Sequence, residues 1–292
     1  MGRALTALVV VTWALIGFGA LVRAMKAGLA CPDWPLCFGE VVPDVRLEGV
    51  IYEFGHRALA GLVAFGYLAL LVASRRDGAL KKAIGQPMVA AGVLLAAQIV
   101  MGGLTVLIVD KSHGGDPRPA AWTVTTHLIL GNAFAATIAW AALRVRDGLK
   151  GIKSPAPPSM TLLGAWTASL ALQFVLGGVI ASNLAGMVCI EFPACAGGVW
   201  FPSWSGFVGL QLLHRLNAYV LVALAAWMLW RFRDTSLGVL VRIAGVAILL
   251  QVLVGALNIW LSLPPAVTVA HSALASALFL ITALMWQRAR CP

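Results

Sequence analysis

The chain has 292 residues, of which 61% are hydrophobic and only 11% are charged. Soluble domains carry about 25% charged residues, so this composition excludes an ordinary soluble protein and indicates an integral membrane protein. The formal net charge is +10. The sequence has no nucleic-acid-binding motif, so we expect membrane topology, and not a nucleic-acid partner, to explain the basic residues.

Eight apolar segments are long enough to cross a bilayer as helices, because about 20 residues span its hydrocarbon core. The first segment is longer than the apolar core of a signal peptide and lacks a small-residue cleavage motif, so we expect it to be retained. The sequence therefore predicts an all-α integral membrane protein of eight transmembrane helices. In chain order they cover residues 4–24, 52–73, 83–109, 120–143, 160–183, 207–230, 239–262 and 266–287.

The charged residues sort by the side of the membrane on which the connections between these segments fall. Most of the 21 Lys and Arg residues lie on one side, and most of the 11 acidic residues lie on the other. By the positive-inside rule the basic side is cytoplasmic, which places both termini in the cytoplasm. Nothing marks an organelle transit peptide, so we predict a multi-pass protein of a prokaryotic plasma membrane.

The sequence contains an internal repeat. GGVIASNLAGMVCIEFPAC at 177–195 aligns without a gap on GALVRAMKAGLACPDWPLC at 19–37, at a shift of 158. The same shift carries a later His-Arg pair onto a second His-Arg pair, and two agreeing spacings are hard to obtain by chance. The matched pairs are Cys31 with Cys189, Cys37 with Cys195, His56 with His214, and Arg57 with Arg215.

The repeat continues toward the end of each half of the chain. QIVMGGL at 98–104 resembles QVLVGAL at 251–257, and each is followed by a segment with one histidine. We therefore predict two pseudo-symmetric four-helix bundles, residues 1–150 and 159–292, joined by a polar, proline-rich linker at 151–158. A parallel duplication fits, because both halves begin and end on the same side.

Four histidines, His56, His127, His214 and His271, lie near the predicted external ends of the even-numbered spans. An ionisable residue inside a span is a functional-site hypothesis, although each could instead only hydrogen-bond a neighbouring helix. Because the four histidines form two pairs that the repeat matches, we favour the interpretation that they are ligands of a metal or cofactor. Bundles build cofactor sites from facing helices, and two imidazoles suit the axial ligation of a haem iron, whereas zinc requires more ligands.

The two halves differ beside the first histidine. Glu53 lies one helical turn before His56, so their side chains share a face, whereas the residue matched to Glu53 is Gln211. Glu53 could cap a helix start, where the helix dipole favours a negative charge. Alternatively, it marks the first half as a site of proton transfer or of stabilisation of developing positive charge.

The four matched cysteines fall in the predicted external loops, where disulfides persist. Four cysteines allow three connectivities, but the six-residue spacing in both halves favours local bridges, Cys31–Cys37 and Cys189–Cys195. The bridges could be structural staples that fix the loop over the site. A redox role, in which a thiol pair relays electrons, stays open.

YEFGHR at 52–57 and GLACPDWPLC at 28–37, with His127, His214 and His271 in a duplicated eight-span chain, resemble the haem A synthase family. The resemblance implies an oxidoreductase that converts the C8 methyl of haem O to a formyl group through a hydroxylated intermediate, giving haem A. It implies that His56 and His127 flank the substrate haem, with Glu53 required for catalysis. It also implies that His214 and His271 ligate a haem b cofactor in the C-terminal half.

Arg57 and Arg215 each follow a predicted ligand directly. Guanidinium groups bind carboxylates bidentately, so both could pair with haem propionates; alternatively, each extends to the lipid headgroups. The substrate makes haem O synthase a candidate partner, and the electron acceptor stays open. Small residues such as Gly102-Gly103 and Gly177-Gly178 suit packing within the bundle and also between protomers of a homo-oligomer.

Two functions of other classes remain alternatives. A di-haem membrane protein that exchanges electrons with a quinone would hold two unmodified haems and would tolerate the change of Glu53 to Gln. A transporter with proton-carrying histidines would bind no haem. The transporter is disfavoured because the spans include no short or broken pair near mid-membrane.

Overall fold

The computed structural model describes residues 1–111, 117–148 and 159–290, so the predicted linker at 151–158 lies outside the described residues. The described part contains eight helices that are long and apolar enough to cross a membrane, which confirms the eight predicted spans. They are α1 (Gly2–Ala24), α2 (Val50–Arg76), α3 (Gly78–Leu107), α4 (Ala121–Gly148), α5 (Met160–Ser182), α6 (Gly206–Phe232), α7 (Gly238–Trp260) and α8 (Pro265–Arg290).

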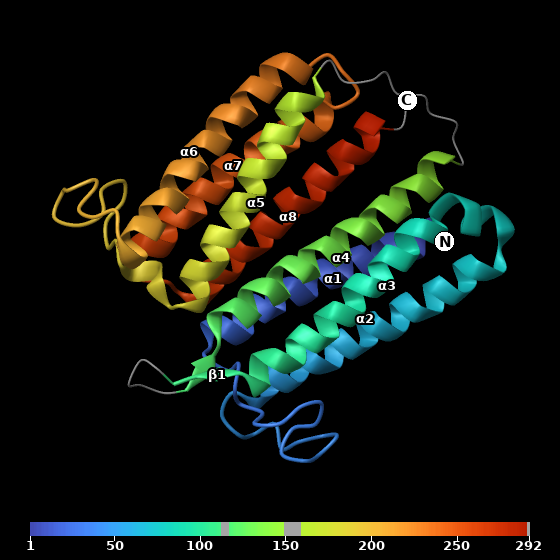
Figure 1. Ribbon diagram of the computed structural model, residues 1–292, viewed down its shortest axis with the longest axis horizontal. Helices are drawn as coiled ribbons and strands as arrows, with labels where there is room; N and C mark the ends of the chain where they lie inside the picture. The colour runs from blue at the N-terminus through green and yellow to red at the C-terminus, as the bar shows by residue number, and fades with distance from the viewer. Residues whose placement is uncertain (112–116, 149–158, 291–292) are drawn as a thin grey trace. The chain divides into compact units, whose positions relative to one another are not determined.

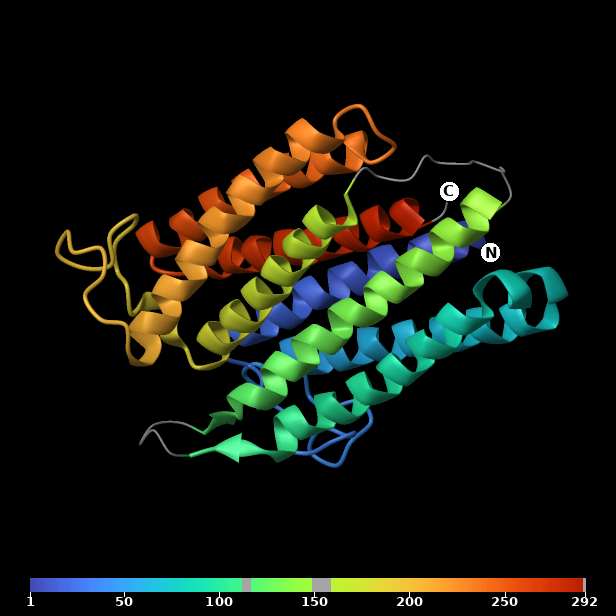
Figure 2. The ribbon, with the colours of Figure 1, turned by 45° about the horizontal axis from the view of Figure 1, so that its top comes forward.

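The chain divides into two compact units, Met1–Arg146 and Asp147–Pro292. In the first unit, α1 to α4 lie side by side (Figures 1 and 2). All four helices contribute to one apolar core, whose fully buried members include Leu5, Tyr67, Met88 and Phe134. Tyr67 also donates its hydroxyl hydrogen to the backbone oxygen of Met88, which ties α2 to α3.

The second unit has its own core, built from α5 to α8. Trp166 of α5 is fully buried, and its indole N–H donates to the hydroxyl of Thr282 on α8 over 2.8 Å. Trp286 of α8 donates in turn to Thr167 of α5 over 2.7 Å. Because an apolar helix interface has little directional preference, these two hydrogen bonds fix the register between α5 and α8.

Large apolar side chains also cover the outside of the helices. Phe65 is 73% exposed, Leu62 68% and Val93 67%. Such exposure would be unfavourable in water, but it is what lipid-facing helix surfaces require, because the bilayer core offers no polar partners. The composition and this outward-facing apolar surface together indicate the same membrane location.

Several helices extend beyond the apolar segments from which they were predicted. Helix α3 begins at Gly78 and not at residue 83, because the Asp77 side chain accepts hydrogen bonds from the backbone N–H groups of Ala79 and Leu80. A side-chain cap of this kind satisfies N–H groups that have no partner within the helix. The polar first turn therefore belongs to the helix although its hydropathy does not show it.

Two long loops, residues 25–49 and 183–205, precede α2 and α6. The second contains a short 3₁₀ helix, Ala185–Met187. A two-stranded antiparallel ribbon, β1 (Val109–Asp110) with β2 (Arg118–Pro119), also forms, and neither small element was predicted. The ribbon projects from the same end of the first unit as loop 25–49 (Figure 1). This end also carries the histidines of that unit.

Candidate functional site

The four predicted histidines all lie within the first turns of the even-numbered helices α2, α4, α6 and α8. Each imidazole edge rests against a glycine of the preceding helix, and a Cβ atom added to that glycine would stand 3.1 Å from the histidine Cε1. A side chain at these positions would displace the histidine ring, so these positions require glycine. We call these four glycines the glycine seats. The pairs are Gly19 with His56, Gly102 with His127, Gly177 with His214, and Gly255 with His271.

The structure brings the histidines together in two pairs, one in each unit. His127 is close enough to His56 to interact with it electrostatically, and His271 has the same relation to His214. The described residues contain no group of three or more His, Cys, Asp and Glu side chains that could hold a metal ion. A pair of imidazoles on facing helices is the donor set of a bis-histidine haem, so the residues fit that group better than zinc.

His56 is the histidine least explained by contacts within the protein. Within the described residues its ring makes no hydrogen bond, its Nδ1 atom is buried, and its neighbour is the edge of Phe18, with ring centroids 6.0 Å apart. A buried polar atom without a partner is costly unless a ligand or another group makes use of the ring. A helix-to-helix hydrogen bond is therefore no explanation for this residue.

Three glutamines bind the other three histidines, and none of the three was predicted as a site residue. Each stands one helical turn before the seat glycine, in the pattern Q-x-x-x-G at 98–102, 173–177 and 251–255. The recurrence of this pattern could have identified the three glutamines from the sequence, whereas a single glutamine in an apolar span does not indicate a site. The contacts are Gln98 Nε2 to His127 Nε2 at 3.1 Å, Gln173 Nε2 to His214 Nε2 at 3.3 Å and to the His214 carbonyl at 3.1 Å, and Gln251 Nε2 to the His271 carbonyl at 3.0 Å.

Glu53 joins the ligand helix to the first disulfide loop. Its side chain is buried, with the residue only 5% exposed. One carboxylate oxygen accepts from the backbone N–H of Cys31 over 2.8 Å, and the other accepts from the Arg57 guanidinium over 2.5 Å. The N-cap of α2 is Gly49, and no side chain caps this helix. Glu53 therefore makes no capping hydrogen bond, because its hydrogen bonds go to the loop and to Arg57, although its charge stands in the first turn of α2, where the helix dipole favours it.

The matched position in the second unit has no carboxylate. Among the residues that the structure describes, Gln211 donates a single long hydrogen bond, 3.5 Å, to the carbonyl of Gly186. Arg215 consequently lacks the acidic partner that Arg57 has, and no ion pair of Arg215 occurs among the described side chains. The carboxylate beside a histidine is a feature of the first unit, as the comparison of Glu53 with Gln211 indicated, whereas its pairing with Arg57 was not predicted.

Arg57 and Arg215 perform the same structural task. Arg57 donates to the carbonyls of Asp33 and Leu36, over 2.8 and 2.5 Å. Arg215 donates to the carbonyls of Ala194 and Cys189, over 2.7 and 3.0 Å, and is buried. Each guanidinium thereby ties a disulfide loop to a helix that carries a histidine. Their pairing with haem propionates stays a prediction.

Both local disulfides, Cys31–Cys37 and Cys189–Cys195, are present and buried. The two loops share a further detail. The Asp33 carboxylate accepts from the N–H groups of Phe38 and Gly39, at 2.6 and 2.8 Å. Glu191, which the shift of 158 matches with Asp33, accepts from the backbone N–H groups of Gly197 and Gly198 in the corresponding turn, over 3.0 and 2.9 Å. An acidic side chain therefore closes the same turn in both halves.

The turn closed by Asp33 is expected to depend on pH. The hydrogen bond from the Gly39 N–H, with that from Phe38 and the Arg57 charge, lowers the pKa of Asp33 below 3.8. A lowered folded-state pKa stabilises the loop above pH about 4 and loses this contribution as pH falls through the lowered value. Amide hydrogen exchange at Phe38 and Gly39, corrected for intrinsic rates, should show protection falling below about pH 4. In the Asp33→Asn variant the protection of these amides should no longer depend on pH in this range. A variant with the same pH profile as the wild type would contradict the role given to Asp33.

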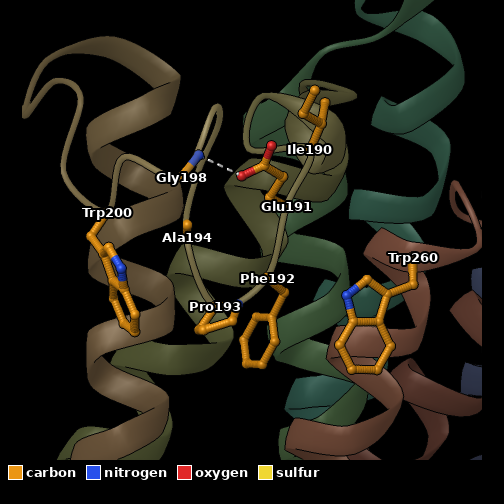
Figure 3. A pocket seen from close by; sticks show the side chains of 8 residues that line it. All are labelled: Ile190, Glu191, Phe192, Pro193, Ala194, Gly198, Trp200 and Trp260. Carbon is orange, nitrogen blue, oxygen red and sulfur yellow. Dashed lines mark hydrogen bonds between the residues drawn. The ribbon is translucent and has the colours of Figure 1, made fainter.

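The second unit also has an open cavity of about 430 Å³ beside its disulfide loop. Figure 3 shows Phe192 and Pro193 lying between the indoles of Trp200 and Trp260. The Phe192 ring meets Trp260 edge-on, with centroids 6.1 Å apart. No histidine lines this cavity, so it is separate from the imidazole pair. Exposed aromatic residues at helix ends suit the membrane interface.

Comparisons with known proteins agree with this geometry. The sequence model of the family of cytochrome oxidase assembly proteins, COX15-CtaA, matches residues 2–50 and 44–283. A "Heme A synthase" of Shewanella oneidensis is 26% identical, covering 94% of this chain and 91% of its own length. One of Shouchella clausii is 29% identical over 80% and 77% of the two chains. One of Halalkalibacterium halodurans is 26% identical over 75% and 72%.

Proposed function

The chain belongs to the COX15-CtaA family of cytochrome oxidase assembly proteins, and we propose that, as a haem A synthase, it divides the reaction between its two halves. It is a multi-pass plasma-membrane oxidoreductase whose substrate is haem O and whose product is haem A. The finer assignment rests on one observation. Of the two histidine sites, only the first has a buried carboxylate, Glu53, paired with an arginine beside the histidine.

The N-terminal half, residues 1–150, takes the substrate. His56 and His127 flank haem O on facing helices and orient it, so that its C8 methyl lies where it can be oxidised to the alcohol and then to the formyl group. Each oxidation releases protons and electrons, and water is the oxygen source that the family resemblance favours. The glycine seats at Gly19 and Gly102 support this role, because they leave the imidazole edges free of side chains.

Glu53 is the carboxylate beside His56 and can accept a proton. It lies one turn from His56 and has both oxygens in hydrogen bonds, to the Cys31 N–H and to Arg57. We assign it to accept a proton or to stabilise positive charge that develops on the substrate before water adds. A carboxylate held in this way is preorganised, since its position does not have to be established during the reaction.

The C-terminal half, residues 159–292, holds haem b as a permanent cofactor between His214 and His271. A bound haem b would supply one-electron transfer. The protein's part is to hold the two imidazoles, through the seats at Gly177 and Gly255 and through the glutamines at 173 and 251. Arg215 lies next to His214 and is the candidate partner for a propionate.

We further propose that both termini are cytoplasmic and that both histidine pairs lie near the external face. The disulfide loops support this orientation. Disulfides persist in oxidising compartments outside the cytoplasm, and both bridges lie in loops bonded to the histidine-bearing helices through Arg57 and Arg215. A haem O synthase supplies the substrate under this proposal. Association into homo-oligomers through the small-residue helix faces is a further expectation.

The proposed function is tested by expression in hosts with and without a haem O supply, followed by extraction and identification of the bound haems by chromatography and mass. We expect haem b in both preparations, and haem A or its hydroxylated precursor only where haem O is supplied. Haem b alone, in equal amounts under both conditions, would sink the proposal and favour the di-haem electron-transfer protein.

A further inference from the structure

We propose that the two halves differ in how firmly they hold their first histidine, so that His56 forms a releasing site and His214 a retaining site. This inference rests on the proposed function, in which haem A leaves the first half and haem b stays in the second. The difference arises from three positions on α1 and α2 and their three counterparts on α5 and α6.

In the second unit, His214 is anchored by a connected set of polar side chains, Ser169, Gln173 and Asn217, which we call the anchor network. The Ser169 hydroxyl donates to the Asn217 side-chain oxygen over 2.9 Å, and the Asn217 amide donates to Gln173 Oε1 over 2.7 Å and to the Ser169 carbonyl over 2.9 Å. Gln173 then donates to the ring and to the backbone carbonyl of His214. The network therefore runs from the backbone of α5 to the ligand on α6.

In the first unit, all three network positions are apolar. The shift of 158 that matches His56 with His214 places Val11, Leu15 and Leu59 where the second unit has serine, glutamine and asparagine. Leu15 packs against the apolar core of the first unit. The glycine seat is retained, since Gly19 contacts His56 as Gly177 contacts His214. The first half thus keeps the seat and lacks the anchor.

His56 is also the exception among all four histidines. His127, His214 and His271 each receive a hydrogen bond from the glutamine of the Q-x-x-x-G pattern. At the fourth occurrence the pattern reads L-x-x-x-G, with Leu15 before Gly19. Each half therefore has a second histidine bonded to a glutamine, and only the first half combines it with a first histidine that receives no such bond. The bond to His127 uses the ring Nε2 and would be exchanged for iron on ligation, whereas the bond to the His271 carbonyl would remain.

An anchor slows ligand loss because it restricts the imidazole before the iron binds, and less freedom is then lost on binding. The bond from Gln173 to the His214 carbonyl does not use the ring, so it is compatible with iron ligation by the imidazole. Without such bonds His56 can tilt away from an iron more readily. One net hydrogen bond corresponds to about a tenfold change in an equilibrium or a dissociation rate.

The test transfers the network in both directions within the full-length protein. One variant, V11S/L15Q/L59N, installs the three polar side chains in the first half. A second, Q173L/N217L, removes two from the other half. Each protein is purified after expression with a haem O supply and mixed with an excess of a haem-scavenging protein, and the haem A and haem b that remain bound are separated and quantified over time.

We expect V11S/L15Q/L59N to slow the loss of haem A about tenfold and leave the loss of haem b unchanged. We expect Q173L/N217L to do the reverse, with haem b lost about tenfold faster. Leu62→Gln, at a lipid-exposed site on α2, is the matched control and should alter neither rate. If the first variant does not fold, the second still decides. Unaltered release of both haems from the folded variants would overturn the inference.

Different results would contradict the proposed function and the proposal of a releasing and a retaining site. Wild-type protein that makes no haem A when haem O is supplied contradicts the proposed function before any variant is examined. Wild-type protein that makes haem A, with release rates independent of these positions, contradicts only the releasing and retaining sites. In V11S/L15Q/L59N the absorption spectrum of haem b serves as an internal reference, because it reports whether the unaltered second site is intact.

Discussion

Replacing Glu53 by Gln is expected to reduce the formation of haem A by about 100-fold or more while leaving haem b bound. Glutamine has nearly the same shape and keeps an oxygen that can accept from the Cys31 N–H. It removes the negative charge opposite Arg57 and the capacity to take a proton. The measurement is the amount of haem A and hydroxylated haem O extracted per chain, compared with haem b from the same sample.

Glu40→Gln is a suitable control, because Glu40 is an exposed carboxylate of the same loop. It should form haem A at the wild-type level. Wild-type levels of haem A in Glu53→Gln as well would show that the carboxylate serves only to hold the loop against α2. Glu53→Ala would then be the informative variant, because it also removes the acceptor for the Cys31 N–H.

The histidine variants are expected to divide by unit. Replacing His214 or His271 by Leu should lower bound haem b from about one per chain to almost none. Each variant would retain only one of the two histidine ligands of the iron. Replacing His56 or His127 by Leu should leave haem b bound and prevent haem A formation. Optical spectra of the oxidised and reduced protein, with identification of the extracted haems, distinguish the two classes of variant.

Each pair serves as the control for the other, since all four changes remove an imidazole from the same depth of a helix. Loss of haem b in the His56 and His127 variants, with retention in the other two, would reverse the assignment of the halves. Equal loss in all four variants that still fold would mean that the protein does not hold one permanent and one transient haem.

Hydropathy was sufficient to predict the eight helices but not where they end. An apolar run marks the part of a helix that lies in lipid, whereas the ends are set by individual hydrogen bonds, such as those that Asp77 accepts at the start of α3. The two-residue strands β1 and β2 were missed because a ribbon of this size has no periodicity to detect. The local disulfides followed from the spacing of the cysteines and their place in loops.

The candidate site was predicted to the level of its ligands and no further. His56 and His127, and likewise His214 and His271, could be paired because the repeat assigns each to a half. The task of Arg57 was not foreseen, because its partners are backbone carbonyls of Asp33 and Leu36, which carry no residue identity. The glutamines were overlooked for a different reason: within an apolar span a polar residue was noted only where it was ionisable.

The turn that Asp33 and Glu191 close in the two halves has a consequence for the history of the chain. A loop with the same bridge, an acidic side chain closing its turn and an arginine bonded to its carbonyls recurs at one fixed offset, together with the glycine and histidine beside it, which is what duplication of a single four-helix unit would leave. The two halves nevertheless differ at most of the aligned positions, among them the carboxylate at 53 and the amide at 211. The four histidines are thus retained in both halves, whereas the residues that surround them differ.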